Sequence, residues 1–247
     1  MKKILVFVVA YQAENFIENV LDRISAQIND SYYYEILVID DCSKDRTYEL
    51  AQKFAFAHPE ITITNLYNPI NQGYGGNQQI GYLYAIDHHF DVVILLHGDG
   101  QYPPEYINEM AEPILNGDFD VMLGSRMKVK TDALRGGMPL YKWIGNQILT
   151  WSENALLKQK LSEYHTGFRA YKVDVLRQIP FQFDSKYYDF DTDIIIQVAD
   201  NHFRIGEIPI PTKYGDGICG VNGMKYGKMI MKSCIESRIM RFGLFYN

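Results

Sequence analysis

The sequence of 247 residues has few cysteines, no long apolar run and no excess of basic residues, and each lack excludes a class of protein. Its three cysteines (Cys42, Cys219 and Cys234) are odd in number and lack the spacing of metal ligands, so we expect neither a disulfide framework nor a zinc site. No apolar run approaches the ~18 residues that a membrane-spanning helix needs. The net charge of −6 argues against general binding to nucleic acid.

Common targeting and phosphate-binding signatures are missing as well. The first apolar run, residues 4–10, is too short for a signal peptide and no cleavage-like site follows it, so we expect a cytoplasmic protein. No Gly-Lys-Ser/Thr follows the glycine cluster at 73–76, which excludes a P-loop. No Gly-x-Gly-x-x-Gly or glycine-rich basic loop follows the first apolar run. These absences disfavour a dinucleotide oxidoreductase and a nucleotidyltransferase.

Apolar runs alternate with amphipathic stretches along the first half of the chain. This alternation predicts one α/β domain, with a mostly parallel central sheet flanked by helices. Strands are expected at 4–9, 35–40, 61–66, 91–97 and 119–124, and helices at 16–28, 45–57, 75–89 and 103–115. Beyond residue 126 we expect a mobile loop at 128–139, helices at 140–157 and 190–199, and strands at 164–171 and 203–210.

Polar side chains gather where the first four predicted strands end, and a parallel sheet brings those ends to one edge. Such an edge suits a nucleotide, because carboxylates accept hydrogen bonds from base and ribose groups while a divalent cation bridges to phosphates. Plainer explanations remain for some positions, since Asp41 and Ser43 can cap the next helix and the glycines can form a tight turn. The strand-end residues are Tyr11, Glu14, Asp40, Asp41, Asn71, Gly75, Asp99 and Gln101.

The motifs containing these residues resemble those of family 2 glycosyltransferases with the GT-A fold. The likeness is strongest to polyprenyl-phosphate sugar transferases of the dolichyl-phosphate mannosyltransferase type. It covers roughly residues 4–215 and rests on the segments 9–14, 38–45, 71–75, 99–105, 124–126 and 162–169. It implies a Rossmann-like GT-A catalytic domain at 1–223, followed by a basic amphipathic segment at 224–247.

The resemblance also implies roles on the donor side. Asn71 and Gly75 would contact the donor, Asp99 and Gln101 would hold a divalent cation (Mg²⁺ or Mn²⁺), and Arg126 would bind phosphate as a catalytic group. His97 stands where the family has an aspartate; it can ligate a metal, with Mn²⁺ favoured, or simply bond to the backbone at the strand end. The nucleoside pocket would be lined by Ala10, Tyr11, Glu14 and Asp40.

Tyr74 stands where the family has a lysine, which removes one possible phosphate contact. The reaction implied is inverting transfer of a hexose from a GDP- or UDP-linked sugar. Two acceptors stay open at this point: a polyprenyl phosphate, which is already an anion and needs cations to guide it, and a saccharide hydroxyl, which needs a general base.

Asp191 is the first candidate for that base or for a group that orients the acceptor, and Asp193 is the second. Both can instead favour the helix dipole at the start of the next helix. Glu163 and His165 are further candidates for binding the acceptor, although a packing role also suits His165.

Two groups of basic residues are candidates for binding phosphates or a membrane surface. Arg126, Lys128, Lys130 and Arg135 fall in one stretch across the expected mouth, where they would bind phosphates, unless this is only a solvated loop. The segment 224–247 has five bases and one acid among apolar residues, which suits an anionic membrane surface, packing on the body or a dimer contact.

We therefore expect a metal-dependent hexosyltransferase that acts on a polyprenyl phosphate, peripheral on the inner face of the membrane. A transferase that uses a saccharide hydroxyl in cell-surface polysaccharide synthesis is the alternative within the class. A non-catalytic module that binds nucleotide sugars is the alternative outside it, motivated by the missing aspartate at His97.

Overall fold

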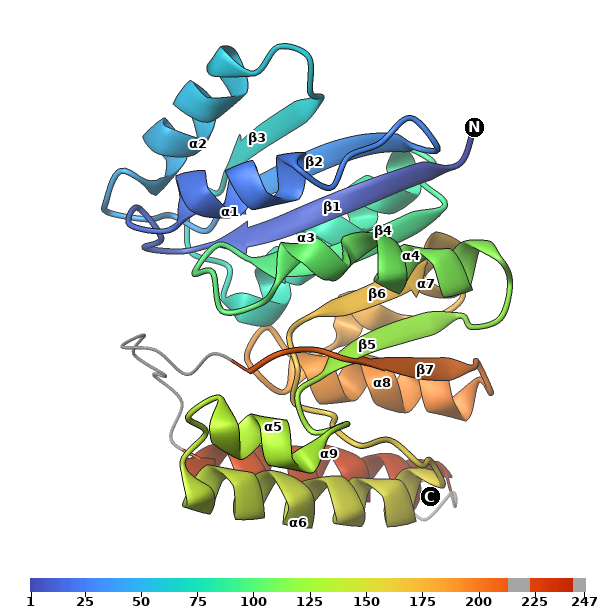
Figure 1. Cartoon of the computed structure of the whole chain (residues 1–247). Helices are drawn as coiled ribbons and strands as arrows, with labels where there is room; N and C mark the ends of the chain where they lie inside the picture. The colour runs from blue at the N-terminus through green and yellow to red at the C-terminus, as the bar shows by residue number, and fades with distance from the viewer. Residues whose placement is uncertain (213–222, 242–247) are drawn as a thin grey trace.

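The computed structural model of the chain describes residues 1–212 and 223–241 and is built on one seven-stranded sheet (Figure 1). The strand order is β3-β2-β1-β4-β6-β5-β7, and β6 alone runs antiparallel to its neighbours. The prediction of an α/β fold with a mostly parallel sheet is confirmed. The strands are β1 (Lys3–Ala10), β2 (Tyr33–Asp40), β3 (Ile63–Tyr67), β4 (Val92–His97), β5 (Val121–Ser125), β6 (Arg169–Lys172) and β7 (Ile205–Pro209).

Helices cover both faces of the sheet because alternate residues of each buried strand point to opposite sides. Leu5 and Phe7 of β1 join one apolar core, whereas Ile4, Val6 and Val8 join the other. The second core lies under α1 (Ile17–Ser25), α2 (Thr47–Ala57) and α4 (Ile107–Leu115), which follows a single 3-10 turn (Pro104–Tyr106). The first core lies under α3 (Tyr74–Asp87), α7 (Val173–Leu176) and α8 (Phe190–Asp200).

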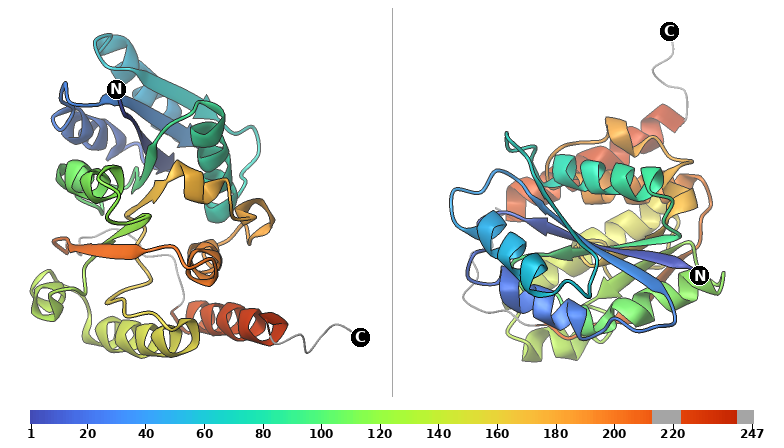
Figure 2. Two further views of the ribbon diagram at one scale, coloured as in Figure 1. Left: turned by 90° about the vertical axis from the view of Figure 1, so that its right-hand side faces the viewer. Right: turned by 90° about the horizontal axis from the view of Figure 1, so that it is seen from above.

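Three more helices form a group at one end of the molecule, below β7 in Figure 1 and again in Figure 2. They are α5 (Lys130–Arg135), α6 (Leu140–Leu157) and α9 (Gly223–Arg241). Helix α9 packs against α6 and α8, and its Ile230 and Cys234 are fully buried. None of the helices in the described residues combines the length and apolar character needed to cross a membrane.

The segment 128–139 differs from its prediction as a mobile loop. It contains α5, which sits on a small apolar cluster of Met127, Ala133 and Met138 with Trp143 packed against it. A helix of six residues is too short to show a repeating pattern, so the sequence alone could not indicate it. The strand expected at 164–171 was also too long, because β6 begins only at Arg169.

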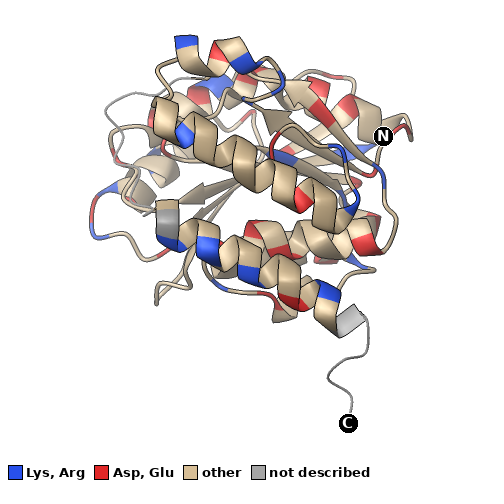
Figure 3. Cartoon of the chain, turned by 90° about the horizontal axis from the view of Figure 1, so that it is seen from below, with Lys and Arg blue, Asp and Glu red and all other residues tan. Residues whose placement is uncertain are grey.

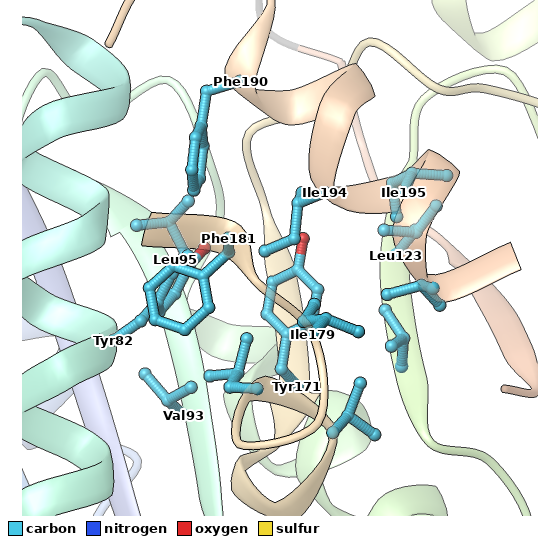
Figure 4. Packing of buried hydrophobic residues seen from close by; sticks show 14 of the residues in the cluster. Tyr82, Val93, Leu95, Leu123, Tyr171, Ile179, Phe181, Phe190, Ile194 and Ile195 are labelled. Atoms are coloured by element: carbon cyan, nitrogen blue, oxygen red, sulfur yellow. The ribbon is translucent and has the colours of Figure 1, made fainter. Parts of the chain in front are cut away.

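An aromatic cluster fixes α3 and α8 on the sheet (Figure 4). Tyr82 of α3 makes edge contacts with Tyr171 and Phe181 and stacks on Phe190, the first residue of α8. All four rings are fully buried. The close approach requires Gly75, since a Cβ there would lie 2.6 Å from Cβ of Phe190. The start of α8 is therefore held tightly against the start of α3.

Candidate active site

The carboxyl ends of β1, β2 and β4 meet at one edge, and the order of strands reverses between β1 and β4. Ala10 pairs with Asp40 and Val9 pairs with His97, so these strand ends are level. In open α/β sheets, the crevice at such a reversal is the place where ligands bind. The structure brings the predicted strand-end residues together there.

Asp40 and Asp41 have different tasks although they are neighbours. Asp41 is buried and accepts from the side chain of Asn68 and the amides of Gln72 and Gly73, so it organises the loop after β3. Asp40 accepts from the amide of Ser43 through Oδ1, while its buried Oδ2 has no hydrogen-bond partner among the described residues. Burial raises the pKa of Asp40, opposed by the bonds to Ser43. An unpaired buried acceptor costs free energy that a ligand N–H or O–H group would recover.

The other residues predicted for the nucleoside pocket lie beside Asp40. Ala10 is buried at the end of β1, whereas Tyr11 is 52% exposed and available to a ligand. Glu14 accepts from the amide of Arg46, and the amide of Glu14 donates to Asp45, which locks the two turns together. The carboxylate of Glu14 thus has a clear structural task.

Asn71 and Gly75 also have structural tasks. The side chain of Asn71 donates to the carbonyl of Asp41 and accepts from the amide of Gly73. The amide of Gly75 donates to the carbonyl of Lys186, and its Cα lies against the segment that leads into α8. Both residues shape the start of α3.

Tyr74, at the start of α3, connects His97 with Asp191. Its hydroxyl donates to Oδ2 of Asp191 over 2.9 Å and lies 3.2 Å from Nε2 of His97. Burial lowers the pKa of His97; Asp99 and Asp191 oppose this, and Arg126 and Arg169 add to it. Burial thus favours the neutral imidazole of His97, with two acids and two arginines near enough to act on its pKa.

Asp99 and Gln101 form the turn that follows β4. Oδ1 of Asp99 accepts from the amide of Gln101, and Gly100 takes a positive φ of 72° between them. Gln101 is exposed and also lines a cavity of about 350 Å³ with Tyr102 and Pro211.

The residues at this turn fit a divalent cation that is held jointly with a ligand. Within residues 1–212 and 223–241 no group of three His, Cys, Asp or Glu side chains is arranged to hold a metal ion. The turn offers the carboxylate of Asp99, with His97 two residues before it and the amide oxygen of Gln101 two residues after it. Mg²⁺ and related ions often bind in this way, with substrate phosphates completing the coordination.

Arg126, directly after β5, is fixed by the fully buried Glu163. Glu163 accepts from the backbone amide of Arg126 at 2.7 Å and from its Nε at 3.1 Å, and the guanidinium also donates to the carbonyl of His165. The guanidinium lies 5.8 Å from the ring centroid of Tyr102, which also makes an edge contact with His97. Glu163 thus positions Arg126, and Arg126 keeps 16% of its side chain exposed.

Asp191, in the first turn of α8, is enclosed on three sides. Besides Tyr74, it accepts from Nε2 of Gln78 at 3.2 Å and lies 3.6 Å from a guanidinium nitrogen of Arg169. Arg169 is itself fully buried and donates to the carbonyls of Asp191, Thr166 and Tyr164. Burial opposes the charge of Arg169, but Asp191, Tyr171 and Tyr74 together outweigh it, so the pKa of the arginine is raised.

The remaining acceptor-side candidates lie elsewhere. Asp193 faces away from Asp191, toward Ser233 of α9 and the amide of Ser185, and burial raises its pKa. His165 lies between Glu153 of α6, with Nε2 3.1 Å from Oε2, and the hydroxyl of Tyr226 of α9, with Nδ1 3.1 Å from it. His165 thus joins α6 to α9.

The basic residues after Arg126 are spread apart. Lys128 lies 3.5 Å from Glu207, and Arg135, on α5, is 81% exposed and lies 3.5 Å from Asp132 of the same helix. The side chain of Trp143 donates to the carbonyl of Lys130, which anchors α5 to α6.

Two residues of the site were not predicted from the sequence. Tyr74 was noted only for the lysine that it replaces, and Arg169 only as part of a motif. Arg169 carries a recognisable signal, because a charged residue between Phe168 and Ala170 in an apolar strand indicates a buried partner. Tyr74 carries no such signal.

Comparisons with known proteins identify the family of the chain. The profile of the family described as Glycosyl transferase family 2 matches residues 5–180. The chain is 28% identical over 223 residues to the UDP-N-acetylglucosamine–dolichyl-phosphate N-acetylglucosaminyltransferase of Methanococcus voltae, with 86% of each chain covered. It is 26% identical over 241 residues to the undecaprenyl-phosphate mannosyltransferase of Micrococcus luteus, covering 91% of this chain and 94% of the relative.

A solved structure shares the fold. It is the glucosyl-3-phosphoglycerate synthase of Mycobacterium tuberculosis in complex with Mn²⁺, uridine diphosphate and phosphoglyceric acid. The TM-score is 0.69 at 15% identity, over 96% of this chain and 78% of that chain. With the GT-A fold present and the family profile matching most of the sequence, the chain belongs to glycosyl transferase family 2.

Proposed function

We propose that the protein transfers a sugar from a nucleotide-diphosphate sugar to a polyprenyl phosphate at a membrane surface. The named relatives support the acceptor, since they act on dolichyl phosphate and undecaprenyl phosphate. They use different sugars, so the sugar and the choice between a GDP- and a UDP-linked donor are left to experiment.

One contrast within the site carries the choice of acceptor. Arg126 is held rigidly by Glu163 with part of its side chain still exposed, whereas Asp191 is 6% exposed and surrounded by Tyr74, Gln78 and Arg169. A saccharide hydroxyl needs a base that reaches its proton, but a phosphate acceptor is already an anion and needs a fixed cation. The arrangement favours the phosphate.

On the donor side, each residue has a task that its contacts support. Oδ2 of Asp40 accepts from an N–H or O–H group of the nucleoside, and Tyr11 covers that group from the exposed side. Asp99, with His97 and Gln101, would hold the divalent cation. When bound, that cation stabilises the negative charge that builds on the leaving diphosphate.

Arg126 acts on the acceptor side in this proposal. Its positive charge suits a phosphate, and Glu163 and the carbonyl of His165 fix the direction of the guanidinium before substrate arrives. Arg169 holds the start of α8 in place by donating to the carbonyl of Asp191. With such an acceptor, we expect the protein to be peripheral on the inner face of the membrane, and we keep 1–223 as the catalytic domain with 224–247 as its basic C-terminal segment.

The test is a transfer assay with GDP-mannose, UDP-glucose and UDP-N-acetylglucosamine, each with Mg²⁺ or Mn²⁺, with and without a short-chain polyprenyl phosphate. We expect a glycolipid product only when the lipid phosphate and a divalent cation are both present. Product formed on a saccharide hydroxyl instead would refute the proposed acceptor. Donor binding without any transfer would indicate a non-catalytic module.

A further inference from the structure

Helix α6 presents an apolar face to solvent, while the residues buried on its inward side, Thr150, Glu153 and Leu157, are mostly polar. After Leu140, which is itself exposed, its exposed positions recur every three or four residues: Tyr141, Ile144, Ile148, Trp151 and Ala155. The side chains are mostly large and well exposed, with Tyr141 at 72%, Ile148 at 60% and Trp151 at 73%. An amphipathic helix on a protein surface normally shows the opposite pattern. We call this set of five residues the α6 stripe.

The inward face of α6 explains why the helix stays in this orientation. Asn146 donates to Glu163, and Asn154 exchanges two hydrogen bonds with the backbone of Leu161. Glu153 is fully buried beside His165. Rotating the helix about its axis would break these polar contacts, so the α6 stripe stays exposed to solvent. A contiguous exposed apolar patch of this kind marks an interaction site.

A row of lysines runs beside the stripe. Lys225, Lys228 and Lys232 are exposed and recur along α9, which packs directly against α6. Figure 3 shows the two helices side by side on one face, α6 almost without charge and α9 with its row of basic residues. Lys232 lies 3.8 Å from Glu236, and both remain mostly exposed.

We propose that the α6 stripe and the lysine row of α9 form a docking surface for a lipid bilayer with anionic headgroups. Apolar side chains that enter the interface and neighbouring lysines that meet anionic lipids are the two contributions by which interfacial helices bind. The charge of this face is the reason for choosing a bilayer, because a second copy of the chain would bring its lysine row toward an equal one. The proposal rests on the lipid acceptor proposed above and names the surface that reaches it.

The same helix connects the bilayer to the site. Asn146 on the inward face of α6 contacts Glu163, and Glu163 holds Arg126. An α-helix with its side chains is about 10 Å across, so one helix diameter separates the docked surface from this network. The phosphate of a polyprenyl phosphate lies at headgroup level. Docking would therefore bring Arg126 to within about one helix diameter of that phosphate.

The first test measures binding to vesicles, independently of turnover. The full chain is sedimented with vesicles of phosphatidylcholine alone and of phosphatidylcholine mixed with phosphatidylglycerol. We expect binding to the anionic vesicles. The double variant Ile148→Glu/Trp151→Glu should lose at least about tenfold in affinity, and Lys228→Gln/Lys232→Gln about fivefold for each lysine removed.

The matched control is Phe56→Glu. Phe56 is a large apolar residue of α2 that is 81% exposed and lies on a different part of the molecule. This variant should bind anionic vesicles as the unchanged chain does. Trp151 provides a second readout that does not depend on a charged substitution: its fluorescence should shift to the blue on anionic vesicles, and Trp151→Phe should abolish that shift.

A comparison of two acceptors separates this proposal from the proposed function. Ile148→Glu/Trp151→Glu should retain activity on a water-soluble short-chain polyprenyl phosphate and lose it on a long-chain acceptor in vesicles. Loss on both, with the folding intact, would mean that α6 acts in catalysis and would overturn the docking role. The proposal would also be overturned if the unchanged chain did not bind anionic vesicles. It would equally be overturned if light scattering showed that the unchanged chain is a dimer and that this variant dissociates it.

Discussion

The hydroxyl of Tyr74 donates to Oδ2 of Asp191 over 2.9 Å and lies 3.2 Å from Nε2 of His97. A tyrosine hydroxyl has a single proton. Since that proton goes to the carboxylate, the contact with His97 requires Nε2 to carry its own hydrogen. The neutral imidazole is thereby held with the lone pair on Nδ1, the nitrogen that has no hydrogen-bond partner in the described part of the chain.

Replacing Tyr74 by Phe tests this relationship. The variant leaves two buried polar groups without their partner, so we expect the free energy of unfolding to fall by about 1–3 kcal/mol. We also expect nitrogen NMR of the imidazole to change from the Nε2–H form to a mixture. Tyr188→Phe is the control, because Tyr188 stacks on Tyr74 and is 47% exposed. An Nδ1–H form in the unchanged protein would contradict the assignment.

Asp191 and Asp193 are two residues apart on α8 and face different ways, so the same substitution at each position gives a test variant and its control. Asp191→Asn removes the charge opposite the buried Arg169, and we expect it to cost about 3 kcal/mol of stability. Transfer to a phosphate acceptor should weaken without being abolished. Asp193→Asn, on the side of α9, should leave transfer almost unchanged. Complete loss of transfer in a folded Asp191→Asn would identify a general base and favour a hydroxyl acceptor.

Glu163→Gln should disturb Arg126 without removing it. The amide keeps one acceptor but loses the charge that holds the guanidinium, so we expect kcat/KM for the phosphate acceptor to fall by about tenfold to a hundredfold. Arg135→Gln is the comparison, because that side chain is 81% exposed on α5. We expect less than about a twofold change there. A large loss in Arg135→Gln would show that this residue binds substrate after all.

Asp184 makes stability depend on pH. Burial and the nearby Asp193 raise its pKa to about 8 in the folded state, although Gln197 donates to it and opposes the rise. The folded state then binds a proton more tightly than the unfolded chain, so stability falls as the pH rises from about 4 toward 8 and levels off above that. Asp184→Asn should flatten this dependence. Urea unfolding at pH 5 and pH 9 measures the free energy of unfolding of both proteins. An equal change in that free energy between the two pH values in the unchanged protein and in the variant would be inconsistent with the assignment.

The sheet and its ligand edge were predictable because they depend on local patterns. Asp40 and His97 end unmistakable apolar runs, and strands of that kind in a βα alternation must bring their ends together. The contact between Tyr74 and Asp191 was not predictable, because it joins positions 117 residues apart. It depends on how closely α3 approaches α8, which is decided by the missing side chain of Gly75.

The orientation of α6 could not be read from its sequence either. Its apolar positions predict a buried face, yet most of them are exposed, and the buried residues are Thr150, Glu153 and Leu157, with Asn146 and Asn154 hydrogen-bonded beside them. The polar partners of those residues, such as Glu163 and the backbone of Leu161, come from a different segment. Only the tertiary structure decides which side of the helix turns inward. The part of the predicted basic segment at 242–247 lies outside the described residues, as does 213–222.

β5 and β6 are antiparallel neighbours, with Leu123 paired with Arg169, and a turn of two residues would suffice to join such strands. The chain instead travels from 126 to 168 before it returns, and this excursion holds α5, α6, Arg126 and Glu163. The hydrogen-bonded register of the sheet does not depend on the length of that excursion. Under the roles proposed above, Arg126 and the apolar α6 stripe would both belong to this one excursion, inserted into a sheet whose other strand ends would face the donor.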